Sequence, residues 1–165
     1  MINRLLSLLR QQSVVHWASP GPQRSGIWPK RLLPQQLPAA SAAAQLGCEV
    51  GAIANSLVFR AGDAPLLILT SGAHRVDTGR VADLLGAGPV RRADPDFVRA
   101  STGQVIGGVA PVGHPQPLRT LVDVWLGKYD VVWAAAGHAH TVFPTSFGEL
   151  LRITNGTPAD IGAES

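Results

Sequence analysis

The densest group of residues that could do chemistry is a short run rich in glycine, with one proline and one histidine. The run is Gly107-Gly108-Val109-Ala110-Pro111-Val112-Gly113-His114, and apolar runs typical of strands lie on both sides of it. Because glycine has no Cβ, backbone N–H groups in such a loop can come close to a carbonyl or phosphate oxygen of a ligand. The proline stiffens one point of the loop. The run therefore predicts either an oxygen-binding loop or a plain tight turn, and its spacing alone favours the turn.

Histidines provide further candidates. His114 ends the glycine-rich run and His74 lies at a predicted strand-to-helix turn, so each could belong to a site or to the framework. His138 and His140 alternate, so on a strand both would face the same side. A three-ligand zinc site needs a further donor, and none lies nearby in the sequence. We therefore expect polar groups at a site or strand end here, and no metal.

Other motifs are absent or have structural explanations. The sequence contains no phosphate-binding Gly-x-x-x-x-Gly-Lys loop, no Gly-x-Gly-x-x-Gly and no Gly-x-Ser-x-Gly. Asp94 and Asp96 could act as paired carboxylates, but their position at a predicted helix start favours capping. Cys48 is the single cysteine, which excludes an internal disulfide and a cysteine-based zinc cluster. It is predicted to be a buried, inert thiol.

Length and composition limit the class of protein. The chain has 165 residues, of which 45% are apolar and 15% charged, as in one globular domain with a sizeable core. No stretch approaches the roughly 20 apolar residues of a membrane span. Five basic residues precede Glu49, the first acidic one, and the rest of the chain has a net charge of −2. Contacts to nucleic acid would come from the basic tail or from a local patch such as Arg60, Arg75, Arg91 and Arg92.

The two parts of the chain differ in the strength of their signals. Residues 1–38 are predicted to form an irregular or disordered extension, because five prolines fall within 19–38 and no period of 2 or 3.6 is sustained. Arginine and serine without acids also resemble an organellar transit peptide. A third interpretation is a misassigned start or a damaged reading frame, in which case the domain would lack part of its fold.

Residues 39–165 are predicted to form one α/β domain with a mixed, mainly antiparallel sheet flanked by helices. The first predicted elements are a helix at 39–46 stopped by Gly47 and a hairpin of strands at 56–60 and 65–70. Two helices follow, one capped by Asp77 with Val81, Leu84 and Leu85 on one face, and one from Asp94 to about Gly103. Buried strands are predicted at 118–124 and 130–135, and a last helix through Leu150, Leu151 and Ile153 starts with a Ser146/Glu149 capping box.

Four segments in this order carry a resemblance to a known family. They are Cys48-Glu49-Val50-Gly51-Ala52-Ile53-Ala54-Asn55-Ser56-Leu57-Val58-Phe59, then Thr70-Ser71-Gly72 with Arg75-Val76-Asp77, then Ile106 to Gly113, and then Ala136-Gly137-His138. Together they resemble the YbaK/ProX family of free-standing aminoacyl-tRNA deacylases, relatives of the editing domain inserted in bacterial prolyl-tRNA synthetases. The resemblance covers about residues 40–160.

The resemblance implies a YbaK-like α/β fold and hydrolysis of the ester that joins a wrong amino acid to the tRNA 3′ end. It implies no cofactor and no covalent protein nucleophile, because a water or a group of the substrate attacks the ester. A cytoplasmic protein is expected, with an aminoacyl-tRNA synthetase as a candidate partner. The implied catalytic residues are Asn55, Gly107, Gly108, Pro111 and Gly113, and the implied substrate-binding residues are Ser71, Gly72, His74, Arg75, His114, Gly137 and His138.

Asn55 is the main departure from the family pattern, in which many members carry a lysine at this place that contacts the terminal nucleotide. Asparagine offers a donor and an acceptor but no charge. Loss of a charge-assisted contact to phosphate would cost about 1.5–3 kcal/mol. Asn55 is therefore consistent with an editing hydrolase of altered specificity, or with a non-catalytic relative that binds aminoacyl-tRNA, a nucleotide or a protein.

Overall fold

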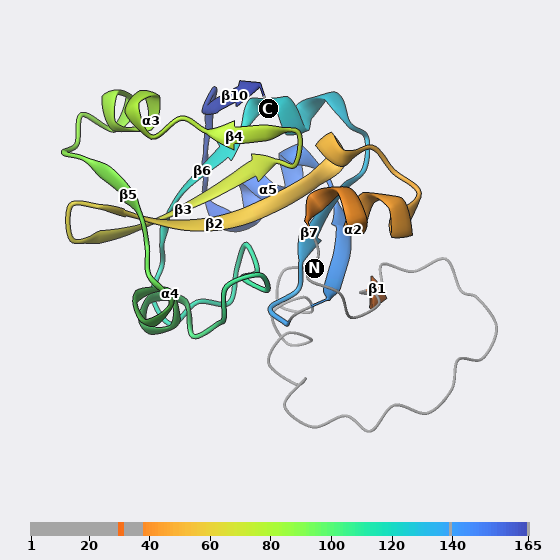
Figure 1. The fold of residues 1–165 in the computed structure, drawn as a ribbon, viewed down its shortest axis with the longest axis horizontal. Coiled ribbons are helices and arrows are strands. Elements are labelled where there is room, and N and C mark those ends of the chain that lie inside the picture. Colours follow the sequence, from red (N-terminus) through yellow and green to blue (C-terminus); the bar gives the residue numbers. More distant parts are fainter. Residues whose placement is uncertain (1–29, 32–37, 139, 165) are drawn as a thin grey trace.

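The computed structural model describes residues 30–31, 38–138 and 140–164, and it shows a mixed sheet with helices packed around it (Figure 1). The strands are β1 (Lys30–Arg31), β2 (Ile53–Ala61), β3 (Ala64–Ser71), β4 (His74–Val76), β5 (Val90–Arg92), β6 (Arg119–Asp123), β7 (Val132–Ala135), β8 (Thr141–Thr145), β9 (Thr157–Ala159) and β10 (Gly162–Glu164). The helices are α2 (Ala39–Leu46), α3 (Thr78–Leu85), α4 (Pro95–Thr102) and α5 (Phe147–Thr154), with 3-10 turns η1 (Val50–Ala52) and η2 (Val124–Lys128).

The sheet has the predicted mixed and mainly antiparallel character. Its order is β1-β8-β7-β2-β3-β6-β9, β5 pairs with β2, and β4 and β10 form a separate two-stranded sheet. Five of the eight described strand pairings are antiparallel, and β2–β7, β3–β6 and β6–β9 are parallel. The predicted fold class is therefore confirmed.

The hairpin of β2 and β3 is the centre of the sheet. The two strands pair from Ala54 opposite Ser71 to Ala61 opposite Ala64, and Gly62 turns the chain with a φ of 63°. Residues 66–69 of β3 are at most 1% exposed, and their side chains alternate between two cores. Leu67 and Leu69 contact the core under α5, whereas Leu66 and Ile68 contact the core under α3. The predicted hairpin is confirmed and is longer than expected.

Local capping signals place the helices. Asp77 Oδ1 accepts from the N–H groups of Gly79 and Arg80 at 3.0 Å, as predicted. Asp94 Oδ1 accepts from Phe97 N–H at 2.9 Å, and Ser146 Oγ accepts from Glu149 N–H at 3.2 Å. The residues that follow α2, α3 and α4 are left-handed glycines, namely Gly47, Gly86 and Gly103. No helix in the described ranges is long and apolar enough to cross a membrane.

Several detailed predictions are wrong. Leu84 is 55% exposed, because the side of α3 that packs against the core consists of Val81, Ala82 and Leu85, and Leu84 lies at the edge of that side. Cys48 is half-buried rather than buried, since it lies in the connection between α2 and η1. The strand predicted from residue 130 begins at Val132, and Val131 is 49% exposed.

The sequence pattern also missed short strands. β4, β5, β9 and β10 have three residues each, which is too short for an alternating pattern to appear. β8 contains Pro144, a residue that normally argues against an inner strand. Within the predicted extension, Lys30–Arg31 form β1 and pair with Val142 and Thr141 of β8. Pro38 precedes α2, and the other residues of the extension lie outside the described ones.

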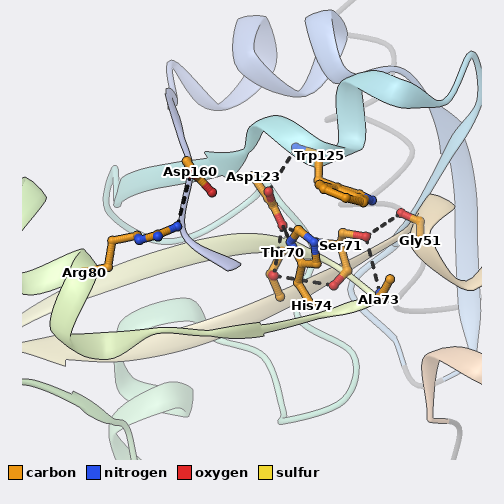
Figure 2. A network of polar contacts seen from close by, with 9 residues as sticks. All are labelled: Gly51, Thr70, Ser71, Ala73, His74, Arg80, Asp123, Trp125 and Asp160. Atoms are coloured by element: carbon orange, nitrogen blue, oxygen red, sulfur yellow. Dashed lines mark hydrogen bonds and ion pairs between the residues drawn. The ribbon is translucent and has the colours of Figure 1, made fainter. Parts of the chain in front are cut away.

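A buried carboxylate holds together the end of the sheet away from the β2–β3 turn. Asp123 is fully buried, and its Oδ2 accepts from Ser71 N–H at 3.0 Å and from Thr70 Oγ1 at 3.3 Å (Figure 2). The same oxygen lies 2.9 Å from Nδ1 of His74, which donates because a carboxylate only accepts. Asp123 Oδ1 accepts from Trp125 N–H at 3.0 Å. One side chain thus joins β3, β4, β6 and η2.

Replacing Asp123 with alanine is expected to lower the free energy of unfolding by about 3–5 kcal/mol, because the buried donors lose their acceptor. The matched control is Asp160→Ala, which removes an exposed carboxylate paired with Arg80 at 3.1 Å and should cost less than about 1 kcal/mol. Urea unfolding followed by circular dichroism measures both. Equal losses in the two variants would contradict the role assigned to Asp123.

Candidate functional site

A cavity of about 620 Å³ lies beside β2 and is lined by several parts of the fold. One wall is β2 from Ile53 to Phe59, and the facing wall is the start of the glycine loop, with Ile106, Gly107 and Val109. The β7–β8 hairpin closes one side, and Ala39 and Ala42 of α2 contribute to the rim. The volume lies in the range of small-molecule sites.

The cavity exists because β2 is only partly paired on one edge. On that edge β2 pairs with β7 at Ile53 and Ala54, and with β5 from Phe59 to Ala61. Between these pairings no described strand borders β2, although Val58 O still accepts from Ala93 N–H. Backbone groups of alternate residues point to the same edge of a strand. The N–H and C=O of Ser56 therefore point into the gap, whereas the carbonyl of Val58 is occupied by Ala93 N–H.

Only a few polar side chains line this cavity among the described residues. Asn55 is half-buried and lines the wall, and Arg92 is the charged side chain among the described lining residues. Ser56 Oγ and His140 Nδ1 are buried and have no hydrogen-bond partner among the described residues. His140 has a φ of 64°, a left-handed conformation that costs energy for any residue with a Cβ. The site therefore combines mainly apolar walls with unsatisfied polar atoms.

Gln104 fixes the glycine loop at Ala110. Gln104 Oε1 accepts from Ala110 N–H at 2.6 Å, and His114 Nε2 donates to Ala110 O at 2.9 Å. Gln104 is itself held by its backbone N–H, which donates to Thr102 Oγ1 at 3.0 Å. Ala110 is 0% exposed and Pro111 is also buried. Both backbone groups of Ala110 are thus satisfied by side chains that flank the loop.

The same glutamine lies between the loop and the β7–β8 turn. Gly113 and Gly137 have φ values of 88° and 90°, which favour glycine. Cβ atoms at these two positions would lie 4.0 and 3.7 Å from Gln104 Nε2. Gln104 therefore packs against two segments that the sequence separates by more than 20 residues.

His114 has a pKa lowered from its usual value, because burial disfavours the charged imidazolium more than the hydrogen bond to Ala110 O favours it. Near neutral pH the ring is uncharged, and it donates to Ala110 through Nε2–H. The structure thus places His114 in the framework of the loop, beside the cavity rather than in its lining.

The predicted site residues fall into three groups in space. Asn55 and Gly107 line the cavity. The second group forms or supports the glycine loop next to it, and consists of Gly108, Pro111, Gly113, His114 and Gly137. The remaining predicted residues lie outside the cavity lining, namely Ser71 and His74 in the Asp123 network, Gly72 against α2 and η1, Arg75 exposed on β4, and His138 exposed in the β7–β8 turn.

Sequence reasoning missed Gln104 and Ser56. Gln104 lies between Gly103, which ends α4, and the glycine loop. This position close to the loop is a weak indication that its side chain contacts the loop. Ser56 gave no signal, because only the sheet pairing shows that its strand edge is open. Within the described ranges no three His, Cys, Asp or Glu side chains lie close enough together to hold a metal ion.

Comparisons with known proteins agree on one family. Residues 34–153 match the model of the aminoacyl-tRNA editing domain. The chain is 32% identical to the uncharacterised protein YwhH of Bacillus subtilis over 110 residues, covering 66% of this chain and 69% of that protein. It is 27% identical to a Cys-tRNA(Pro)/Cys-tRNA(Cys) deacylase named EbsC, assigned as putative, from Enterococcus faecalis, covering 76% and 77% of the two chains.

A solved structure gives the same answer. It is the crystal structure of a putative trans-editing enzyme for prolyl tRNA synthetase, and the two folds superpose with a TM-score of 0.78 at 41% sequence identity. The match covers 83% of this chain and 87% of that chain. The likeness thus includes both the sheet and the helices around it.

Replacing Gln104 with methionine removes the acceptor for Ala110 N–H while keeping a side chain of similar length. We expect the free energy of unfolding to fall by about 1–3 kcal/mol, because a buried N–H loses its partner. The Ala110 amide should also exchange with deuterium faster than in the wild type. Gln104→Glu is the control, since it keeps an oxygen at the same position. Unchanged exchange at Ala110 in the methionine variant would contradict the hydrogen bond from Ala110 N–H to Gln104.

Proposed function

Because this chain belongs to the family of aminoacyl-tRNA editing domains, as the resemblance of its motifs to YbaK/ProX proteins predicted, we propose that it hydrolyses mischarged aminoacyl-tRNA. The observation that carries the proposal is the cavity between the glycine loop and the open edge of β2. The aminoacyl group would enter this cavity, with the ester next to the Gly107 peptide. Its mostly apolar walls suit a small side chain.

The reaction requires attack on the ester carbonyl by water, and the free hydroxyl of the terminal ribose can assist by orienting that water; attack by the hydroxyl itself would only move the acyl group to another ribose oxygen. With water, a C–O bond forms at the carbonyl carbon, the bond to the ribose oxygen breaks, and the products are a free amino acid and a ribose hydroxyl. Backbone N–H groups at the cavity wall would stabilise the developing oxyanion, and Ser56 and Gly107 are the nearest candidates. Orientation of the bound end supplies the rest of the rate.

A covalent route through the protein has less support. Ser56 is the serine among the described residues that line the cavity, but its Oγ has no hydrogen-bond partner among them and so no base to activate it. Water is therefore the proposed nucleophile, assisted by the substrate's own hydroxyl, and Asn55 orients the reacting end through its amide.

Asn55 also defines the second candidate function, a non-catalytic protein that binds aminoacyl-tRNA or a nucleotide. The family pattern favours a lysine at this position, and asparagine carries no charge to hold a phosphate. Arg92 supports the enzymatic proposal, because its side chain lines the same cavity and can supply the missing positive charge.

The named similarities bear on the substrate and partner. EbsC is assigned Cys-tRNA(Pro) and Cys-tRNA(Cys), and the solved relative is assigned to prolyl tRNA synthetase. We therefore propose that the tRNA 3′ end is the binding partner, that tRNA(Pro) carrying a small wrong amino acid is the first substrate to test, and that a synthetase is a candidate for association. This substrate would be met in the cytoplasm.

Purified protein is expected to release one or a few small amino acids from a panel of aminoacyl-tRNAs well above the rate of buffer hydrolysis. The panel spans Ala, Ser, Thr, Cys and small non-protein amino acids on several tRNAs. Gly107→Ala should lower the rate at least tenfold, because a φ of 87° is strained for alanine and the loop must shift. Gly148→Ala on α5 is the control, since a Cβ there meets open space. A flat panel from folded protein would refute the hydrolase.

Substitution of Asn55 separates the two candidate functions. Asn55→Ala should lower the deacylation rate at least tenfold while the melting temperature changes little, because Asn55 lines the cavity and is only half-buried. Asn55→Lys should tighten tRNA binding about tenfold by adding a charge-assisted contact. An inactive wild type with an active Asn55→Lys variant would identify a binding relative. A fall in stability with unchanged activity per folded molecule in Asn55→Ala would contradict substrate contact.

A further inference from the structure

Three arginines lie where β5 pairs with β2, and we call Arg60, Arg91 and Arg92 the arginine cluster. Arg60 lies directly opposite Arg91 in the antiparallel ladder, so these two side chains share one face of the sheet. Arg92 lies opposite Phe59 and projects from the other face. Like charges directly opposite each other on one face of a sheet destabilise the pairing. The pairing of Arg60 with Arg91 is therefore a cost to the fold, and an anion bound between them would offset it.

Little in the protein neutralises these charges. Arg91 and Arg92 are exposed, and neither forms an ion pair within the part of the chain that the structure describes. Arg60 is paired with Asp63 at 3.3 Å, but the Asp63 side chain is fully exposed and such pairs contribute little. The nearby carboxylate of Asp94 is occupied in capping α4. The cluster is thus available to an external anion.

Arg92 joins the cluster to the cavity, because it is part of the cavity lining. The Arg60–Arg91 pair is the next pair along the ladder toward the β2–β3 turn, and the strands β5 and β2 that carry it lie side by side in Figure 1. The Arg60 guanidinium lies over the Phe97 ring, with Cζ 4.6 Å from the ring centroid, which fixes its direction. Arg75 belongs to β4, beyond the opposite end of β3, and so lies apart from this path.

We infer that Arg60 and Arg91 of the arginine cluster bind the phosphate backbone of the tRNA acceptor stem, while Arg92 contacts the 3′ end that occupies the cavity. The inference rests on the proposed function, because it takes the cavity as the place of the aminoacyl end. Guanidinium groups bind phosphate oxygens through paired N–H donors. Charged residues on an edge strand also discourage pairing with other chains, but that purpose needs no arginine on β2 and none in the cavity wall.

The first test is the salt dependence of binding to uncharged full-length tRNA. Arg91→Gln is the variant of choice, because Arg91 is exposed and its removal relieves the repulsion with Arg60. We expect weaker binding, and a slope of log Kd against log salt that falls by about one when one phosphate contact is lost. The control is Arg152→Gln, which removes the same charge from α5, where Arg152 pairs with Glu149. Unchanged binding and slope in Arg91→Gln would overturn the inference and favour an acidic protein partner instead.

The second test compares two substrates of different length. Arg91→Gln should lower kcat/KM about tenfold on full-length aminoacyl-tRNA and leave it unchanged on an aminoacylated CCA fragment, which lacks the stem. Equal losses on both substrates would overturn the stem assignment. If the wild type hydrolyses neither substrate, the proposed function fails, while the salt-dependence test still decides whether the arginine cluster binds tRNA.

Discussion

The incomplete pairing of β2 on one edge is the constraint on which the cavity and its surroundings depend. β3 covers the other edge almost completely, whereas β7 and β5 each cover only one end of the open edge. The gap leaves the backbone of Ser56 unpaired by any described strand, gives the cavity its wall, and brings Arg92 of β5 to its border. A longer β5 or β7 would fill the same space with backbone hydrogen bonds and would abolish the site.

Two separate groups of polar contacts stabilise the sheet and the glycine loop around the cavity. The Asp123 network fixes one end of the sheet and is fully internal, so its members Ser71 and His74 serve the fold. The contacts of Gln104 fix the glycine loop, whose start lines the cavity. Polar residues near glycines therefore have two different roles here, and only their position relative to the sheet separates them.

Local chemistry made much of the fold predictable from the sequence. The caps at Asp77, Asp94 and Ser146 and the β2–β3 hairpin depend on neighbours within a few residues, which a sequence displays directly. Strands of three residues such as β5 depend on partners far along the chain, so no local sequence pattern predicts them. Distant contacts also decide which residues belong to the site. Ser71 lies on β3, the strand that follows the cavity-lining β2 in the chain, but its hydrogen bonds belong to the Asp123 network.

The hydrogen bonds and packing contacts of Gln104 make the glycine loop part of a larger structural unit. The loop conformation depends on the end of α4 through Thr102 and on the β7–β8 turn through the space at Gly137. Transplanting only the glycine loop into another protein would leave Ala110 N–H without its partner. A transferable module would have to include α4 and the β7–β8 turn. In related chains, the residues at positions 104, 113 and 137 should accordingly change together rather than one at a time.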